Sequence, residues 1–256
     1  MHTVAIVNQK GGVGKTAMTL GIASAIRSKG GRVLVIDLDP QANATSGLGA
    51  SGGPGVLTSG NVLASGKRGI AVQAISATSW GDGVYCIPAD VALAEREHET
   101  GRRGHEFRLR NSLEGVDGYD LALIDCQPSV GELVTNALVA ADYALIVSKA
   151  EIDSLVGIEN MLEIIQVIKQ HYNGDLKVAG IAINDVDLRS GEQQFRFAEL
   201  RRNYGDLVWE PHLPHRTRIA DAKGGSVPIH DFGYRAKEAI AVYDALTERL
   251  LSLGNG

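Results

Sequence analysis

Residues 10–16, Lys-Gly-Gly-Val-Gly-Lys-Thr, have the types and the order of a phosphate-binding loop. They follow the apolar residues 4–7 and precede a stretch with helical character. Glycines let backbone N–H groups turn toward phosphate oxygens, Lys15 is long enough to reach the outer phosphates, and the Thr16 hydroxyl suits Mg²⁺. A helix that begins here adds the positive end of its dipole. The sequence therefore predicts that this segment binds the phosphates of a nucleotide.

The loop departs from the general P-loop pattern at its first position. In the pattern G-x-x-x-x-G-K-[ST], the first glycine would fall on Gln9. The chain instead has Lys10 at the start of the loop. Two other segments combine an apolar, strand-like run with acids, namely residues 33–43, VLVIDLDPQAN, and residues 121–129, LALIDCQPS. An acid at the carboxyl end of a strand is suited to Mg²⁺, which prefers oxygen ligands.

Together these segments resemble the deviant Walker A proteins, and among them the ParA/Soj partition ATPases. Residues 8–16 resemble the first motif of that family, residues 33–43 the second, and residues 121–129 the Walker B strand and turn. Residues 211–228 resemble the loop that closes over the adenine. The resemblance runs nearly end to end and implies an ATPase that uses ATP and Mg²⁺. Larger plasmid ParA proteins carry an N-terminal DNA-binding domain, and this chain resembles the small form without it.

The resemblance implies roles for single residues. Lys15 contacts the β- and γ-phosphates, and Thr16, Asp39 and Asp125 serve Mg²⁺. Asp39 also orients the attacking water. Lys10 reaches across a two-fold interface to the nucleotide of a second copy, so the expected catalytic residues are Lys10, Lys15 and Asp39. The expected nucleotide contacts are Lys10, Gly11, Gly12, Val13, Gly14, Lys15, Thr16 and Ala17, with Asn184, Pro214, His215 and Arg216 at the adenine.

Four positions in these motifs are unusual or ambiguous. Asp37 and Asp39 lie two positions apart at a strand end and point the same way, so both can face the site. Ala17 stands where the family usually has a second Thr or Ser, which removes one hydrogen bond to the α-phosphate, worth about 0.5–1.5 kcal/mol. Gln127 replaces the usual first proline after the Walker B strand and frees a backbone N–H.

DNA binding is implied by resemblance and by local charge. Arginines that match Arg189 and Arg218 grip DNA phosphates in the family without reading sequence. Between residues 189 and 223 there are seven Lys or Arg residues and five Asp or Glu residues. Binding of this kind depends strongly on salt because it releases counterions. We therefore expect an ATP-bound homodimer on nonspecific double-stranded DNA, located on the nucleoid, with a ParB-like protein as activator.

Composition limits the remaining possibilities. With 256 residues, of which 44% are apolar, the chain can build one substantial core, and we expect a single domain over residues 1–256. The formal net charge of −5 confines DNA binding to a local patch. No run approaches the ~20 apolar residues of a membrane span, and a strand begins almost at residue 1, which predicts a cytoplasmic protein. Cys86 and Cys126 lack metal-ligand spacing and are expected to be buried.

The order of the expected elements predicts an α/β fold. Apolar runs alternate with longer helical segments, as in a P-loop NTPase with a doubly wound, mostly parallel sheet flanked by helices. Strands are expected at residues 4–7, 33–36, 84–87, 121–124, 144–147 and 178–183. Helices are expected at residues 17–29, 107–113, 133–140, 157–171, 193–204 and 234–251. Residues 47–66 are rich in Gly, Ser and Ala, which predicts a loop.

A DNA-partition switch is the favoured function, and three alternatives remain. The same motor can position another cargo. A MinD-like ATPase would act at a membrane, but that class ends in a basic amphipathic helix and residues 250–256, LLSLGNG, contain no basic residue. A protein resembling the nitrogenase iron protein would need cluster-binding cysteines, which the two separate cysteines do not supply.

Overall fold

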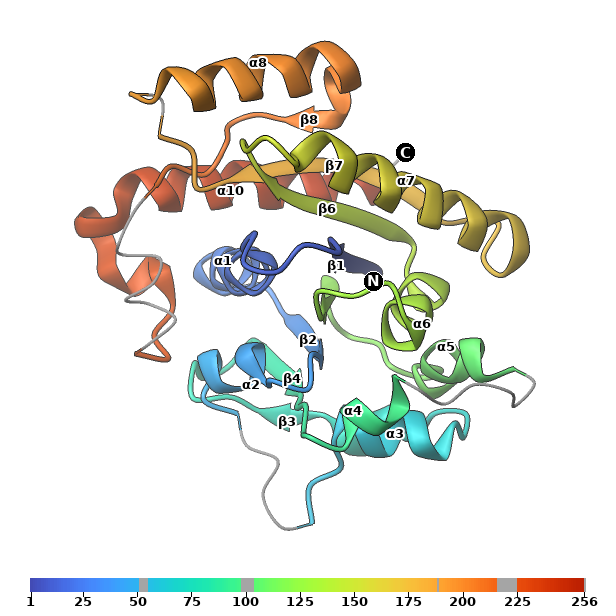
Figure 1. Ribbon diagram of the computed structural model, residues 1–256. Helices are drawn as coiled ribbons and strands as arrows, with labels where there is room; N and C mark the ends of the chain where they lie inside the picture. The colour runs from blue at the N-terminus through green and yellow to red at the C-terminus, as the bar shows by residue number, and fades with distance from the viewer. Residues whose placement is uncertain (51–54, 98–103, 188, 216–224, 256) are drawn as a thin grey trace.

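Eight strands form one sheet through the middle of the computed structural model, which describes residues 1–50, 55–97, 104–187, 189–215 and 225–255 (Figure 1). Their order is β3-β4-β2-β5-β1-β6-β7-β8. All neighbours pair in parallel except β3 and β4. The strands are β1 (His2–Val7), β2 (Val33–Leu38), β3 (Ser76–Ala77), β4 (Val84–Ile87), β5 (Leu121–Cys126), β6 (Tyr143–Lys149), β7 (Lys177–Asn184) and β8 (Val208–Trp209). The predicted fold class is confirmed.

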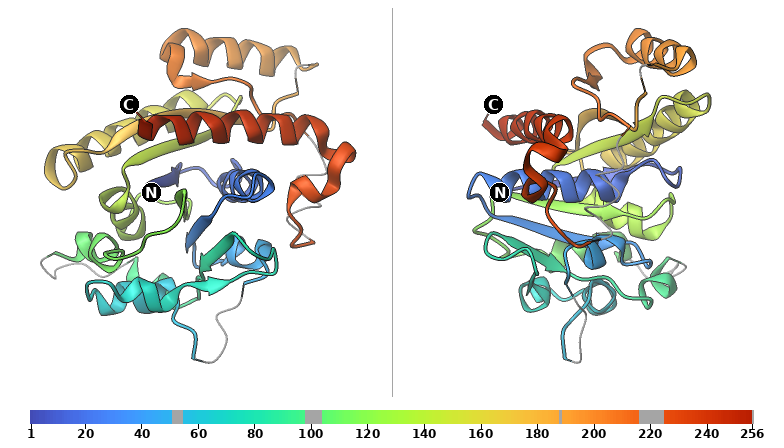
Figure 2. Two further views of the ribbon diagram at one scale, coloured as in Figure 1. Left: turned by 180° about the vertical axis from the view of Figure 1, so that it is seen from behind. Right: turned by 90° about the vertical axis from the view of Figure 1, so that its left-hand side faces the viewer.

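The central strands are apolar along their whole length because both faces of the sheet are covered. Successive residues of β1 alternate between two cores: Val4 and Ile6 face one, and Ala5 and Val7 face the other. Figure 2 shows the helices on the two sides of the sheet. The chain leaves β1 toward β2 on one side and passes from β5 to β6 on the other, so the sheet changes direction at β1. Ligands of such sheets bind at the carboxyl ends of the strands at this point.

Three helices cover one face, namely α1 (Lys15–Ser28), α2 (Asn43–Gly47) and α10 (Lys237–Ser252). The other core is covered by α3 (Ser59–Ser65), α4 (Leu93–Arg96), α5 (Arg108–Ser112), α6 (Glu132–Ala140), α7 (Ser154–His171) and α8 (Gly191–Tyr204). Gly21 allows α1 and α10 to approach closely, because a Cβ there would lie 2.0 Å from Cε1 of Tyr243. The Tyr243 hydroxyl donates to the Ala17 carbonyl oxygen at 3.1 Å. The start of α1 is therefore tied to the C-terminal helix.

The structure corrects several predictions made from the sequence, and it adds the short helices α2 and α4, which were not predicted. Strands β3 and β8 were not predicted, and each has two residues, too few for a periodic pattern. The predicted loop at residues 47–66 contains the helix α3, whose N-cap is Thr58, with its side chain accepting from the Asn61 backbone N–H. The helix predicted at residues 234–251 begins three residues later, at Lys237, because residues 234–236 belong to the 3₁₀ segment Ile229–Ala236 that precedes α10.

Within the described part of the chain, the helices are too short or too polar to cross a membrane. Cys86 and Cys126 are both buried, as predicted.

Candidate active site

The phosphate-binding loop joins the carboxyl end of β1 to the N-terminus of α1. Gly14 caps the helix in a left-handed conformation, φ 100°, and no side chain caps the first turn. A Cβ at Gly14 would lie 2.0 Å from Nδ2 of Asn184, which donates to the Val13 carbonyl oxygen at 2.8 Å. Only glycine fits this position. The helix begins at Lys15, two residues before the predicted start, so its first N–H groups point into the loop.

Lys15 lies inside the loop rather than on the surface. Its Nζ donates to the backbone oxygens of Asn8, at 3.0 Å, and Lys10, at 3.2 Å. Burial lowers the pKa of this ammonium group, and the nearby carboxylates Asp125 and Asp39 act against that shift. Two carbonyl oxygens of the loop therefore accept hydrogen bonds from the Lys15 ammonium group. Phosphate oxygens of a nucleotide can replace them as acceptors.

Asp125 brings a buried carboxylate to the same place. It pairs in register with Ile6 of β1 and Asp37 of β2. Its Oδ1 accepts from the Thr19 hydroxyl at 2.9 Å, while Oδ2 has no hydrogen-bond partner among the described residues. Burial raises the pKa of Asp125 to about 7, and the Asp37 carboxylate adds to that shift. The sequence did not single out Thr19, although it lies one turn after Thr16 on α1.

These residues fit a magnesium ion. The free Oδ2 of Asp125 is an oxygen donor without a partner, and Thr16 supplies a hydroxyl at the start of α1. The described residues contain no group of three or more His, Cys, Asp or Glu side chains able to hold a metal. A magnesium site in a phosphate-binding loop does not need such a group, because phosphate oxygens and water complete its coordination.

The two acids at the carboxyl end of β2, Asp37 within the strand and Asp39 just after it, have separate surroundings. Oδ2 of Asp37 accepts from the backbone N–H and the hydroxyl of Thr45, at 2.8 and 2.7 Å, and Oδ1 accepts from the Asp39 backbone N–H at 3.0 Å. Burial raises the pKa of Asp37 to about 6. Asp37 therefore holds α2, and it also lies close enough to Asp125 to raise the pKa of that carboxyl. Asp39 accepts from the Gln41 backbone N–H at 2.9 Å and lies close enough to act on Lys15.

Lys10 points away from its own loop and is 38% exposed. Its Nζ lies 2.6 Å from Oε2 of Glu151, a residue that the sequence did not single out. Glu151 also belongs to a chain of ion pairs. The Nζ atom of Lys149 lies 4.0 Å from Oε1 of Glu151 and 2.8 Å from Oδ2 of Asp185. The sequence feature that could have identified Glu151 is its position just after the carboxyl end of β6, the strand that pairs with β1.

The residues predicted at the adenine lie together at the end of β7. The Leu213 backbone N–H donates to the Ile183 carbonyl oxygen at 2.9 Å, so residues 213–215 run beside residues 183–186. His215 Nδ1 lies 2.5 Å from Oδ1 of Asp185. Asn184, Pro214 and His215 are therefore neighbours, while Arg216 lies outside the described residues.

Comparison with known proteins places this site in a family. A family model described as an AAA domain matches residues 1–178. The chain is 33% identical to the sporulation initiation inhibitor protein Soj of Bacillus subtilis, over 96% of each chain. It is 35% identical to the chromosome-partitioning ATPase Soj of Thermus thermophilus, covering 87% of this chain and 84% of that one. The chain belongs to the ParA/Soj family of P-loop ATPases.

A solved structure agrees with this assignment of fold. It is named cobyrinic acid a,c-diamide synthase, from Mycobacterium smegmatis, and contains an ATP analogue and magnesium. The TM-score is 0.76 and the identity 31%, with 91% of this chain and 92% of that one covered. The chain therefore shares its fold with that structure over nearly its whole length.

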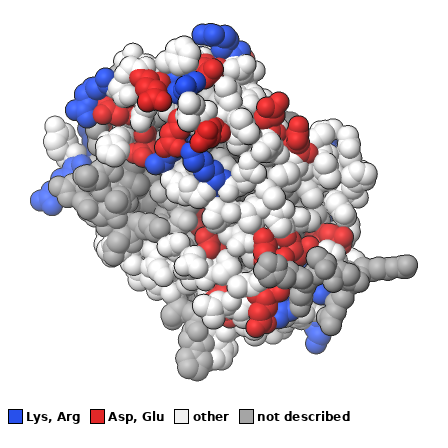
Figure 3. Space-filling model, in the orientation of Figure 1, with Lys and Arg blue, Asp and Glu red and all other residues white. Residues whose placement is uncertain are grey.

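The residues that the ParA/Soj resemblance assigns to DNA contacts are only partly described. Arg218 lies outside the described residues. The Arg189 side chain is 87% exposed, and its Nε and Nη2 both donate to the Asp187 carboxylate at 2.9 Å. Figure 3 shows Lys and Arg side chains mixed with Asp and Glu side chains over the α8 end of the molecule. Two basic residues there are also ion-paired, Arg196 with Glu199 and Arg201 with Glu210.

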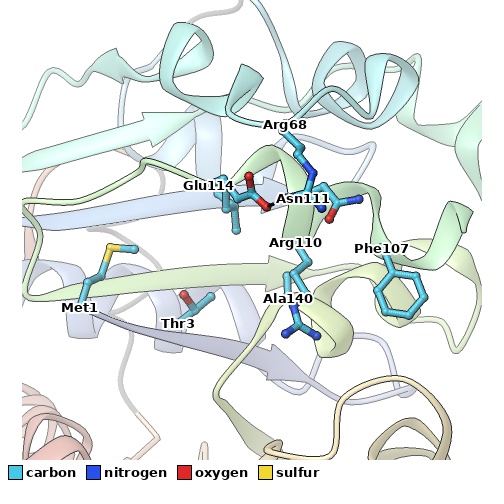
Figure 4. Close-up of a pocket in the computed structure, with 9 residues that line it drawn as sticks. Met1, Thr3, Arg68, Phe107, Arg110, Asn111, Glu114 and Ala140 are labelled. Atoms are coloured by element: carbon cyan, nitrogen blue, oxygen red, sulfur yellow. Dashed lines mark hydrogen bonds and ion pairs between the residues drawn. The ribbon is translucent and has the colours of Figure 1, made fainter.

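A cavity of about 550 Å³ lies near the amino end of the central strand β1, away from the phosphate-binding loop (Figure 4). It is lined by Thr3, at the amino end of β1, whereas the phosphate-binding loop follows the carboxyl end of that strand. Arg68 and Glu114 meet at its wall, 2.5 Å apart. The cavity is thus separate from the nucleotide site of the ParA/Soj family.

Proposed function

We propose that this ParA/Soj family member is an ATP-dependent switch for DNA partitioning. In this proposal, ATP and Mg²⁺ join two copies, the dimer binds DNA without reading its sequence, and a ParB-like partner stimulates hydrolysis. Support comes from a relative named as a chromosome-partitioning ATPase, aligned over 87% of this chain. Further support comes from a structure at 31% identity whose name records an ATP analogue and magnesium.

Each residue of the site has a part in hydrolysis. The N–H groups at the start of α1 and the Lys15 ammonium bind phosphate oxygens and offset their charge. Thr16, Asp39 and Asp125 would hold Mg²⁺, and the bound ion would neutralise charge that develops on the β- and γ-phosphates. Asp39 orients the attacking water, because Asp37 is already engaged with Thr45. Positioning and electrostatics account for most of the catalysis of phosphoryl transfer.

The position of Lys10 is the main observation that supports the proposed dimer. The Lys15 side chain lies inside the loop, whereas the Lys10 side chain is 38% exposed and lies next to Glu151. The two residues Ile152 and Val156 beyond Glu151 are large and apolar, and they are 64% and 59% exposed. Exposed apolar residues close in the chain to Glu151, the partner of Lys10, support a second copy here, with Lys10 reaching the phosphates of that copy.

Size-exclusion chromatography with light scattering tests the proposal. Wild type with ATP and Mg²⁺ should be dimeric and should migrate with nonspecific duplex DNA at low salt, whereas ADP should leave it monomeric. Lys10→Ala should bind ATP and remain monomeric, and Lys15→Ala should not bind ATP. A dimer of Lys10→Ala that forms with ATP contradicts the interfacial role. ATP-dependent pelleting with liposomes, without DNA binding, would favour a membrane-positioning ATPase.

A further inference from the structure

A groove of about 450 Å³ lies between α6 and α7, which pack side by side in Figure 1. Its lining includes Val130, just before α6, and Val167, on α7. These side chains are 48% and 50% exposed. Single exposed valines are ordinary, but two that line one groove form an apolar surface that a partner can cover.

The groove is acidic as well as apolar. It is lined by Glu106, Glu132 and Glu163, and no Lys or Arg residue lines it within the described part of the chain. Glu132 is 2.6 Å from Nδ1 of His105, and Glu106 is 3.5 Å from Nε2 of the same ring. The remaining acid, Glu163, is exposed on α7. A ligand that carries positive charge beside apolar side chains complements this lining.

The groove is connected to the active site by a short segment. Val130 lies three residues after Gln127, at the turn that follows Asp125 and the carboxyl end of β5. The Gln127 amide donates to the Ser129 hydroxyl at 3.0 Å, and the Gly131 backbone N–H donates to the same hydroxyl at 3.4 Å. A ligand that packs on Val130 therefore contacts the turn that leads back to the buried carboxylate.

We propose that this groove binds a basic amphipathic helix from a partner protein. Such a helix places apolar residues at i, i+3, i+4 and i+7 against Val130 and Val167 and directs its lysines or arginines toward the three glutamates. DNA would be repelled by this acidic lining. A second copy is assigned instead to the surface near Lys10, whose exposed residues Ile152 and Val156 do not line this groove. In assigning this helix to the activator of hydrolysis, the inference rests on the proposed function.

The test uses an 18-residue peptide of leucine and lysine, with its leucines at helical spacing and a fluorescein label. Fluorescence anisotropy measures its binding to the full chain without nucleotide or DNA. We expect Glu163→Lys to weaken binding at least tenfold. The matched control is Glu159→Lys, one turn earlier on α7, where Glu159 is outside the groove and close enough to Tyr204 to act on its hydroxyl. This control should change binding less than twofold.

Hydrogen exchange then locates the peptide. Protection of residues 130–135 and 161–168 supports the proposal, whereas protection elsewhere, an equal loss in both variants, or no binding to wild type overturns it. Val167→Gln, which keeps the charge of the groove, should also weaken binding. Thermal unfolding checks that the variants are folded. ATP-dependent dimerisation of Glu163→Lys is measured separately and should be normal, so failure of the partition switch and failure of the groove give different results.

Discussion

The Nζ atom of Lys10 lies 2.6 Å from Oε2 of Glu151, although 141 positions separate the two residues. Both side chains are about 40% exposed, so the pair is close to water. Exposed ion pairs of this kind contribute roughly 0.2–1 kcal/mol. The contact is therefore weak enough for the proposed ATP-driven dimerisation to break it.

Glu151→Gln should favour the dimer, because Lys10 no longer has to leave a carboxylate. A symmetric dimer would break two such pairs, one in each protomer, so we expect the protein concentration at half-dimerisation in ATP to fall by roughly two- to thirtyfold. Analytical ultracentrifugation across a concentration series measures this change. The control is Glu248→Gln, which removes the exposed ion pair between Glu248, on α10, and Lys29. It should leave dimerisation unchanged. Weaker dimerisation of Glu151→Gln would mean that Glu151 takes part in the assembled interface.

Asp125→Asn should stabilise the protein in the absence of nucleotide. The substitution removes a carboxylate that is fully buried and has one oxygen without a hydrogen-bond partner among the described residues. A neutral amide costs less to bury, and we expect the free energy of unfolding to rise by on the order of 1–3 kcal/mol. Urea unfolding without Mg²⁺ measures the difference.

The same variant tests the metal site. ATP with Mg²⁺ should stabilise wild type more than ATP with EDTA, and in Asp125→Asn this difference should shrink or vanish. Asp117→Asn replaces an exposed acid and should leave both quantities unchanged. A variant that is less stable without nucleotide, yet keeps the full response to Mg²⁺, would show that Asp125 is structural.

The central part of the fold could be predicted from the sequence because strands covered on both faces are continuous apolar runs. Strands β1, β2 and β5 show this pattern, and each was predicted within two residues of its observed ends. The helix α3 was missed although Thr58 and Asn61 form a capping box, since the Gly, Ser and Ala around them favour a loop. Two-residue strands such as β8 depend on their neighbours in the sheet rather than on their own residues.

The site was predictable where its residues are contiguous and not where they meet through the fold. The phosphate-binding loop follows β1, and Asp125 lies near the end of β5. Both can be recognised from the residues next to them in the sequence. Thr19, which donates to Asp125, and Glu151, which pairs with Lys10, are 106 and 141 positions from their partners. The distinct role of Asp37 likewise depends on Thr45 in α2, which the sequence pattern does not connect to it.

Asp39→Ala should slow hydrolysis and keep the fold. A group that orients the attacking water contributes about 10²–10⁴-fold, so we expect single-turnover ATP hydrolysis to fall by at least 10²-fold. The ATP-bound dimer should then remain on DNA. Normal turnover would mean that a different acid orients the water.

The matched variant is Asp37→Ala, two residues earlier. Asp37 accepts three hydrogen bonds that hold α2 and the Asp39 backbone, so its loss should lower the free energy of unfolding by roughly 1–3 kcal/mol. Thermal unfolding separates the two acids: Asp37→Ala should unfold at a lower temperature, and Asp39→Ala should unfold near wild type. Equal destabilisation of both variants would contradict this division of roles.

Asp187→Ala and Arg189→Ala should change DNA binding in opposite directions. Arg189 is exposed but donates both its Nε and Nη2 to the Asp187 carboxylate. In the ATP-bound dimer, Arg189→Ala removes one phosphate contact from each protomer, so the slope of log affinity against log salt should fall by about two. Asp187→Ala removes the competing carboxylate and should strengthen binding. Arg68→Ala, which removes an exposed arginine paired with Glu114, is the control and should leave the slope unchanged. An unaltered slope in Arg189→Ala would exclude that residue from the DNA contact.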